Sequence, residues 1–134
     1  MPLHWDENLY QYIKRVAEVS ARLGIPSIEE EDGVVIQSIS HAYALRGAND
    51  LFLLDLGAGI GYSTLWLLMG AKPVCEEMRK RCRIVAVERD PILAHYARKV
   101  LSEIQMKSSR VIIDVVEGDA TTYLEREWRI VRWI

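Results

Sequence analysis

The sequence predicts an α/β domain with a doubly wound, mostly parallel sheet. Three apolar runs, over residues 51–56, 83–88 and 110–116, have the composition of strands that are buried on both faces. Helical patterns lie between these runs, and strands that alternate with helices pair in parallel through right-handed crossovers. Glycines or acidic residues stand where each run ends, at the sheet edge where open α/β folds bind their ligands.

The length and composition fit one globular domain. The chain has 134 residues, of which 50% are hydrophobic and 27% are charged. Its 17 basic and 19 acidic residues give a net charge of −2, without the basic footprint of a dedicated nucleic-acid binder. No apolar run is long enough to span a membrane, and the N-terminus lacks the pattern of a signal peptide. We therefore expect a single cytoplasmic domain over residues 1–134, with N-terminal helices over 1–46 and a core over 51–134.

The first element is an amphipathic helix that begins after Asp6. Aspartate is a favoured N-cap residue, and Gly24 followed by Pro26 ends the helical pattern. The positions that recur at helical spacing, and that we expect to face inward, are Leu9, Ile13, Val16 and Ser20 or Leu23.

A second helix is expected over residues 33–46. The acidic run over 29–32 precedes it, and carboxylates at this place favour the positive N-terminal end of a helix. A metal or partner site is the alternative interpretation of those acids. The apolar positions of this helix are Val35, Ile36, Ile39, Ala42, Tyr43 and Leu45.

Helical segments also connect the strands. One is expected over residues 62–69, and a charged helical piece follows over 73–81. Asp90 and Pro91 open another helix, because aspartate caps N-termini and proline suits the first helical position. The inner face of that helix consists of Leu93, Ala97, Val100, Leu101 and Ile104.

Residues 128–134 are the candidate for a fourth strand, although Arg129 and Arg132 suit a buried central strand poorly. Two large apolar side chains of this stretch, Trp128 and Trp133, would mark an interface if exposed. A weak or missing fourth strand would leave an apolar sheet edge open. We therefore expect a homo-oligomer that forms through this edge or through the two tryptophans.

The cysteines and a basic cluster receive structural interpretations. Cys75 and Cys82 are too few for a disulfide scaffold, and their spacing places them on one face of a helix, so we expect structural or surface thiols rather than a metal site. We expect a solvated face where Arg79, Lys80, Arg81 and Arg83 cluster, with contact to an anionic substrate as the alternative.

A glycine-rich turn follows the first strand, in the segment Asp55-Leu-Gly57-Ala58-Gly59-Ile-Gly61. Glycines allow positive φ angles and let a ligand approach the backbone, and the helix that follows offers unpaired N–H groups. A dinucleotide site requires a third glycine three positions after the second, where this sequence has Tyr62. The turn therefore does not match the dinucleotide pattern. A tight turn without a ligand is the other alternative.

Two more acids stand at the ends of the following strands. Glu88 ends the second strand, where a carboxylate can accept both hydrogen bonds of a ribose diol, and Asp119 follows the third. Together with Asp55 they predict a ligand site at the carboxyl edge of the sheet. Asp90 is interpreted as the N-cap before Pro91. For the residues that open the helix after the turn both roles stay open: Tyr62 faces a cofactor or the core, and Ser63 caps the helix or contacts a cofactor.

These motifs resemble class I S-adenosylmethionine-dependent methyltransferases, and within them the O-methyltransferases of the caffeoyl-CoA and catechol type. The resemblance lies in the segment Ile25-Pro26-Ser27-Ile28, the turn followed by Gly61-Tyr62-Ser63-Thr64, the segment Glu88-Arg89-Asp90-Pro91, and Val116-Glu117-Gly118-Asp119-Ala120. It implies a Rossmann-like fold and S-adenosylmethionine as cofactor. The residues it assigns to the cofactor are Asp55, Gly57, Ala58, Gly59, Gly61, Tyr62, Ser63, Glu88, Gly118, Asp119 and Ala120.

The resemblance also marks what this sequence lacks. The family has seven strands, and an aspartate at the end of the fourth ligates a divalent metal. Three or four strands are expected here, the chain is C-terminally short for the family, and no aspartate matches that ligand, so we assign no metal ligand and no catalytic residue. His41 and His95 are expected to be structural or solvent-facing.

The sequence thus predicts an S-adenosylmethionine-dependent methyltransferase domain that transfers a methyl group to an oxygen of an unidentified small molecule. It carries the cofactor-binding half, while the metal and substrate half is absent. The alternative is a non-catalytic module that binds the cofactor or acts in an oligomer. A nicotinamide or flavin oxidoreductase is disfavoured by Tyr62.

Overall fold

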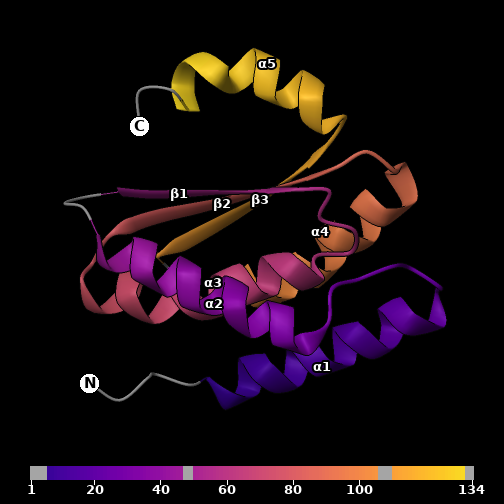
Figure 1. The fold of residues 1–134 in the computed structure, drawn as a ribbon, viewed down its shortest axis with the longest axis horizontal. Coiled ribbons are helices and arrows are strands. Elements are labelled where there is room, and N and C mark those ends of the chain that lie inside the picture. The colour runs from indigo at the N-terminus through magenta and orange to yellow at the C-terminus, as the bar shows by residue number, and fades with distance from the viewer. Residues whose placement is uncertain (1–5, 47–49, 106–109, 132–134) are drawn as a thin grey trace.

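The structure is a computed structural model that describes residues 6–46, 50–105 and 110–131, with the side chains of 128–131 left out of the description. Along the chain the elements are α1 (Glu7–Arg22), α2 (Glu30–Leu45), β1 (Asp50–Leu56), α3 (Tyr62–Glu77), β2 (Arg81–Glu88), α4 (Pro91–Gln105), β3 (Val111–Glu117) and α5 (Ala120–Val131). Figure 1 shows the sheet between two helical layers, with α5 on one face and the other helices on the opposite side.

The sheet is parallel and has the strand order β1-β2-β3. Its central strand, β2, is the most buried, because it is flanked on both sides and covered on both faces. Helices follow β1, β2 and β3 in turn, so the fold is the predicted α/β class with a Rossmann-like doubly wound sheet. Within the described residues β1 pairs with β2 alone, and its other edge carries no strand.

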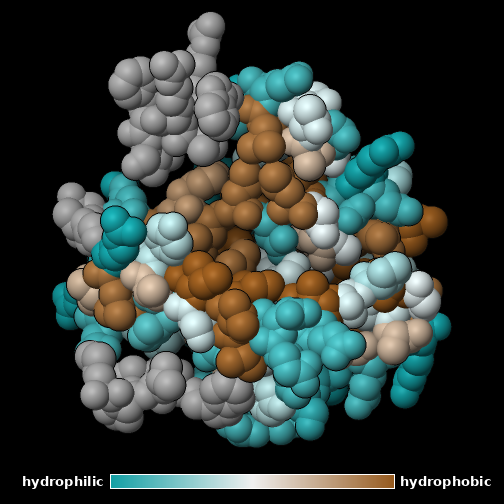
Figure 2. Space-filling model, viewed as in Figure 1, coloured by the Kyte–Doolittle hydropathy of each residue, from teal (hydrophilic) through white to brown (hydrophobic). Residues whose placement is uncertain are grey.

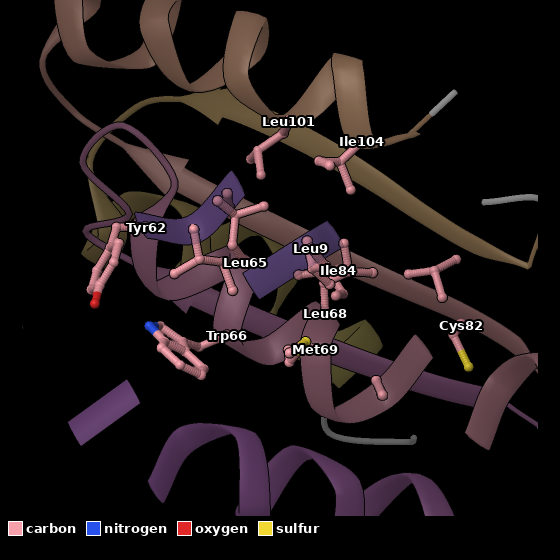
Figure 3. Close-up of a cluster of buried hydrophobic side chains, with 14 of the residues drawn as sticks. Leu9, Tyr62, Leu65, Trp66, Leu68, Met69, Cys82, Ile84, Leu101 and Ile104 are labelled. Atoms are coloured by element: carbon pink, nitrogen blue, oxygen red, sulfur yellow. The ribbon is translucent and has the colours of Figure 1, made fainter. Parts of the chain in front are cut away.

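The core lies between the sheet and the layer that contains α1, α3 and α4. Trp66, Leu65 and Leu68 of α3 are fully buried there, against Ile84 of β2 and Leu101 of α4 (Figure 3). The expected inner face of α1 is confirmed, and the Asp6 carboxylate caps this helix by accepting the N–H of Leu9 at 3.0 Å. The buried positions of α1 are Leu9, Ile13, Val16 and Ser20.

Two predictions of secondary structure were wrong. The separate helices over 62–69 and 73–81 are one continuous helix, α3, which passes through Gly70 and Pro73. The backbone of residues 128–131 belongs to α5 and forms no fourth strand, while residues 132–134 lie outside the described part. Asp119 explains the second error, because its carboxylate accepts the N–H of Thr122 at 3.0 Å and so starts a helix there.

The helix α2 packs through small and polar residues instead of its apolar ones. Its buried positions are Gly33, Gln37, Ser40 and Ala44. A Cβ on Gly70 of α3 would lie 2.2 Å from the backbone oxygen of Gln37, so the two helices approach each other too closely for any larger residue. Of the expected apolar positions, Ile36 is partly buried against the core, whereas Val35 is 56%, Ile39 52% and Tyr43 53% exposed.

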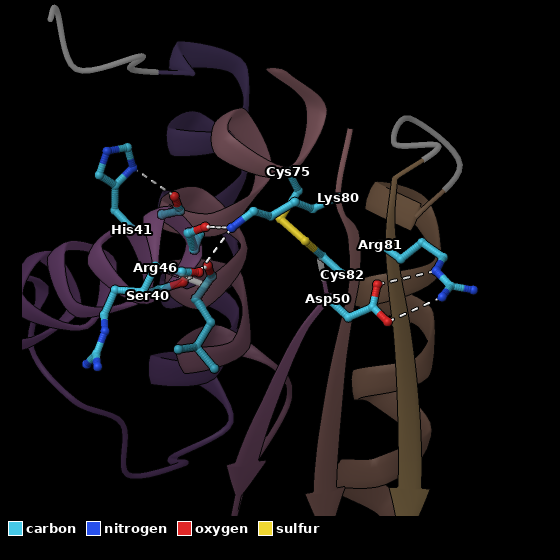
Figure 4. Close-up of a disulfide and its surroundings, with 11 residues drawn as sticks. Ser40, His41, Arg46, Asp50, Cys75, Lys80, Arg81 and Cys82 are labelled. Carbon is cyan, nitrogen blue, oxygen red and sulfur yellow. Dashed lines mark hydrogen bonds and ion pairs between the residues drawn. A yellow bond between two sulfur atoms is a disulfide. The ribbon is translucent and has the colours of Figure 1, made fainter. Parts of the chain in front are cut away.

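The cysteines and the basic cluster differ most from expectation (Figure 4). Cys75 ends up in α3 and Cys82 in β2, and the two buried residues form a disulfide. Lys80, expected on a solvated face, is buried at 4% exposure, and its ammonium donates to the carbonyl oxygens of Ala44 and Arg46. A tight reversal of the chain after α3 turns both Lys80 and Cys82 inward.

Candidate functional site

The glycine turn after β1 is the centre of the candidate site. Gly57, Gly59 and Gly61 have φ angles of 76°, 60° and 98°, which only glycine adopts without strain. The N–H groups of Gly57 and Ala58 both donate to the carbonyl of Val87, at 2.8 and 3.0 Å, and this fastens the turn to the neighbouring strand. Nothing lies within 4 Å of the place where a Cβ on Gly57 would stand. The turn therefore presents bare backbone to open space at Gly57, while Ala58 and Ile60 are buried.

Asp55 lies directly below this turn. Its Oδ2 accepts the hydroxyl protons of Ser63 at 2.6 Å and of Thr64 at 2.7 Å. The carboxylate thereby links the end of β1 to the first turn of α3. Among the described residues no hydrogen bond reaches Oδ1, which leaves one oxygen of Asp55 for a cationic group.

Glu88 ends β2 and is 9% exposed. One of its oxygens accepts the N–H of Gly59 at 2.9 Å, and the other accepts the N–H of Asp90 at 2.8 Å. A buried carboxylate that receives two backbone N–H groups is held in one orientation. Glu88 thus braces the glycine turn from the side, across the sheet edge.

Asp119 follows β3 and is exposed. The N–H and hydroxyl of Thr122 donate to its carboxylate at 3.0 and 3.2 Å, and these hydrogen bonds hold its pKa below the ordinary value. The N–H of Gly118 donates to the carbonyl of Glu88 at 2.9 Å. Ala120 is the first residue of α5. The end of β3 therefore lies beside the end of β2.

The structure brings the three acids to one edge of the sheet. Asp55 pairs in register with Ala86, and Glu88 pairs with Glu117, so the three strand ends stand side by side in the order β1-β2-β3. Adjacent strands lie about 4.8 Å apart. The predicted site residues of the glycine turn, β2 and β3 consequently line one continuous edge.

The sequence left two roles open for each of Tyr62 and Ser63, and the structure shows what these residues contact. Ser63 donates to Asp55 and does not cap α3, since Gly61 stands at the N-cap position. Tyr62 is 7% exposed and packs edge-on against Trp66, with ring centroids 6.4 Å apart. The same tyrosine also borders the cavity described next, so it contacts both the core and the candidate site.

A cavity of about 110 Å³ lies between the glycine turn and the segment that joins α1 to α2. This joining segment, residues 25–28, covers the turn, and the Cγ2 atom of Ile25 is 4.0 Å from where a Cβ on Gly59 would stand. The sequence interpretation did not assign residues 25–28 to the site. The only signal for them was their place in the quoted resemblance.

A second and larger hollow, of about 700 Å³, opens at the amino ends of the strands, away from the three acids. Figure 2 shows apolar side chains in the hollow between α5 and the sheet. Arg81 and Arg83 stand at this end and pair with Asp50 and Asp114, at 3.3 and 2.8 Å.

In the described part of the chain, no group of three or more His, Cys, Asp or Glu side chains could hold a metal ion. None of the described helices is long and apolar enough to cross a membrane.

Known proteins resemble this chain in structure but not in sequence. No family model matches the sequence, and no curated protein matches it. Among the solved structures that this chain resembles is a protein-L-isoaspartate O-methyltransferase, with 16% sequence identity and a TM-score of 0.44. The match covers 69% of this chain and spans 24%, about a quarter, of the length of that protein.

Proposed function

We propose that this chain binds S-adenosylmethionine at the carboxyl edge of its sheet and belongs to a methyltransferase of the O-methyl-transferring kind. One observation carries the proposal. Three carboxylates, Asp55, Glu88 and Asp119, stand at the ends of three adjacent parallel strands, beside a glycine turn whose backbone is exposed at Gly57. A ligand with cationic groups at one end and a ribose and adenine at the other matches this row of acceptors.

The residues fit the cofactor in order along the edge. The free oxygen of Asp55 would accept the methionine ammonium, and the glycine turn would pass beneath the sulfur. Glu88 would accept hydrogen bonds from the ribose hydroxyls, and Asp119, an exposed carboxylate after β3, would accept one from the adenine amino group. The remaining cofactor-binding residues of this proposal are Gly57, Ala58, Gly59, Gly61, Tyr62, Ser63, Gly118 and Ala120.

The cavity under residues 25–28 limits how the ligand would lie. Its volume, about 110 Å³, is well below the roughly 300 Å³ of the smallest common ligand sites. Only the methionine end would be enclosed, beside Tyr62 and Ser63. The nucleoside would lie outside, along the open edge formed by Glu88 and Asp119.

Bound S-adenosylmethionine supplies a methyl group on a positively charged sulfur, which an acceptor oxygen takes up by in-line displacement. This leaves S-adenosylhomocysteine and releases the acceptor proton. The residues described above bind and orient; none of them is proposed as the base that receives that proton. The methyl acceptor is a small molecule whose identity this chain does not specify.

The alternative is a non-catalytic module that binds the cofactor without transferring its methyl group. Calorimetric titration with S-adenosylmethionine, S-adenosylhomocysteine and NAD⁺ tests the proposal. We expect binding of the first two, and a loss of at least tenfold in affinity for Asp55→Ala but not for Asp50→Ala, an exposed control at the opposite end of β1. Binding without methyl transfer to any phenol or catechol acceptor would favour the module. If neither S-adenosylmethionine nor S-adenosylhomocysteine produces a heat of binding, the methyltransferase and the cofactor-binding module are both ruled out.

A further inference from the structure

The apolar residues of α2 form a stripe that the fold leaves uncovered. Val35 and Ile39 lie on the side opposite the buried positions, Tyr43 lies on the flank that borders this side, and all three are more than half exposed. Figure 2 shows apolar side chains gathered on the face of the molecule that α2 and β1 present to the viewer in Figure 1. Contiguous exposed apolar surface on a folded domain marks an interaction site.

The stripe has a charge at each end. At 100° per residue, the line opposite the buried side of α2 runs through Glu31, Val35, Ser38 or Ile39, Ala42 and Arg46. Glu31 stands in the acidic first turn of the helix, and Arg46 stands where the helix ends. The guanidinium of Arg46 lies over the ring of Tyr43, 5.8 Å from its centroid, at the border of the stripe.

We propose that a second copy of this chain packs on the stripe, with the two α2 helices antiparallel about a two-fold axis. If the axis passes between Ser38 and Ile39, Glu31 of each copy meets Arg46 of the other. Val35 then meets Ala42, and Ser38 meets Ile39. In these two pairs a larger side chain faces a smaller one, Val35 against Ala42 and Ile39 against Ser38, which is the complementarity that closely packed helices require.

The pattern is self-complementary in the sense that a two-fold interface requires. One surface must supply both halves of each contact in such a dimer. A parallel pairing would instead place Glu31 beside Glu31 and Arg46 beside Arg46, and like charges in contact disfavour association. The charge arrangement therefore selects a second copy in the antiparallel orientation. This inference does not depend on the proposed cofactor.

The interface would be small. A helix of 16 residues is about 24 Å long, and one helix pair buries less than the roughly 1,200 Å² of a stable standard complex. We therefore expect weak, reversible dimers instead of a permanent complex.

Sedimentation equilibrium between about 1 and 200 μM tests the proposal. We expect a monomer–dimer equilibrium that Ile39→Glu weakens at least tenfold. Ile92→Glu is the matched control, because Ile92 is an isoleucine of α4 with 67% exposure, and this variant should dimerise like the unaltered chain. Thermal melts followed by circular dichroism establish that both variants are folded.

A charge exchange tests the register. Glu31→Arg and Arg46→Glu should each weaken the dimer about tenfold, because each places like charges together twice across the axis. The double variant should restore the dimer to within about threefold of the unaltered chain. A monomer at every concentration would overturn the proposal. So would a dimer that survives Ile39→Glu, because it would have to form elsewhere, for example at the open edge of β1.

Discussion

The backbone N–H of Gly59 donates to the carboxylate of Glu88 at 2.9 Å, across the gap between the glycine turn and the end of β2. The second oxygen of the same carboxylate holds the N–H of Asp90 at 2.8 Å. One side chain thus sets the position of the turn after β1 and the start of α4 together. Glu88 has a structural task in addition to the ribose contact proposed for it.

Replacing Glu88 should therefore reduce both stability and binding. Glu88→Ala leaves two N–H groups near the site without their acceptor, and we expect the free energy of unfolding to fall by about 1–3 kcal/mol. The affinity for S-adenosylmethionine should fall at least tenfold. Urea denaturation and calorimetry measure the two effects. Arg89→Ala, an exposed neighbour, is the control; equal losses in both variants would speak against the role given to Glu88.

The disulfide between Cys75 and Cys82 closes a short loop between α3 and β2. A loop of this length is expected to contribute about 2–3 kcal/mol by restricting the unfolded chain. Reduction, or the double variant Cys75→Ser with Cys82→Ser, should lower the free energy of unfolding by that amount. Alkylation under denaturing conditions, followed by mass spectrometry, counts the free thiols.

Two alkylated cysteines in unreduced protein would contradict the disulfide. The experiment also bears on the expected cytoplasmic location, because disulfides are rare in cytosolic proteins. Protein taken directly from cells and alkylated at once would report the state of the pair in its own compartment.

The contact between α2 and α3 depends on a glycine. A Cβ on Gly70 would meet the backbone oxygen of Gln37 at 2.2 Å, and that oxygen cannot yield without a shift of the whole helix. We expect Gly70→Ala to lower the free energy of unfolding by about 1–3 kcal/mol. Gly118→Ala is the control, since nothing lies within 4 Å of its Cβ position. A Gly70→Ala protein as stable as the control would show that the helices are less tightly packed.

Alkaline pH should weaken the contact between α1 and α4 and so lower the stability of the fold. The hydroxyl of Tyr12 donates to the carbonyl of Val100 at 2.7 Å, and burial, reinforced by Glu103, raises the pKa of Tyr12 to about 12. Because the folded state keeps the proton more tightly than the unfolded state, this contribution is complete below pH 10 and is lost as the pH rises from 10 to 12. Stability measured against pH should fall across that window, and less steeply in Tyr12→Phe. Identical slopes for the two proteins would refute the assignment.

Local signals in the sequence predicted much of this fold. Capping aspartates gave the starts of α1 and α4, and both carboxylates accept the N–H groups expected of them. The apolar runs gave the three strands, and the ends of those runs gave the row of acids. Such features depend on neighbouring residues, so a single sequence contains the information.

The errors arose where contacts between residues distant in the sequence determine the local structure. Gly70 and Pro73 resemble a helix end, but α3 continues through both, and at Gly70 the backbone of α2 packs against it. The apolar residues of α2 were expected inside, yet the small residues face the core, and of the apolar ones Ile36 packs against it while Val35, Ile39 and Tyr43 are more than half exposed. Cys82 was placed on a helix with Cys75, and the chain reversal between them was not foreseen. The start of α5 was overlooked because Asp119 was interpreted only as a ligand contact.

The central claim is that S-adenosylmethionine binds over the glycine turn. Its most direct test is a titration followed by two-dimensional ¹H–¹⁵N spectra of the assigned protein. The account predicts that the amide signals of Gly57, Gly59 and Gly61 shift in a saturable way, while those of Gly33 and Gly70, buried between α2 and α3, stay in place. Saturable shifts confined to other parts of the chain, or no shift at millimolar ligand, would contradict it.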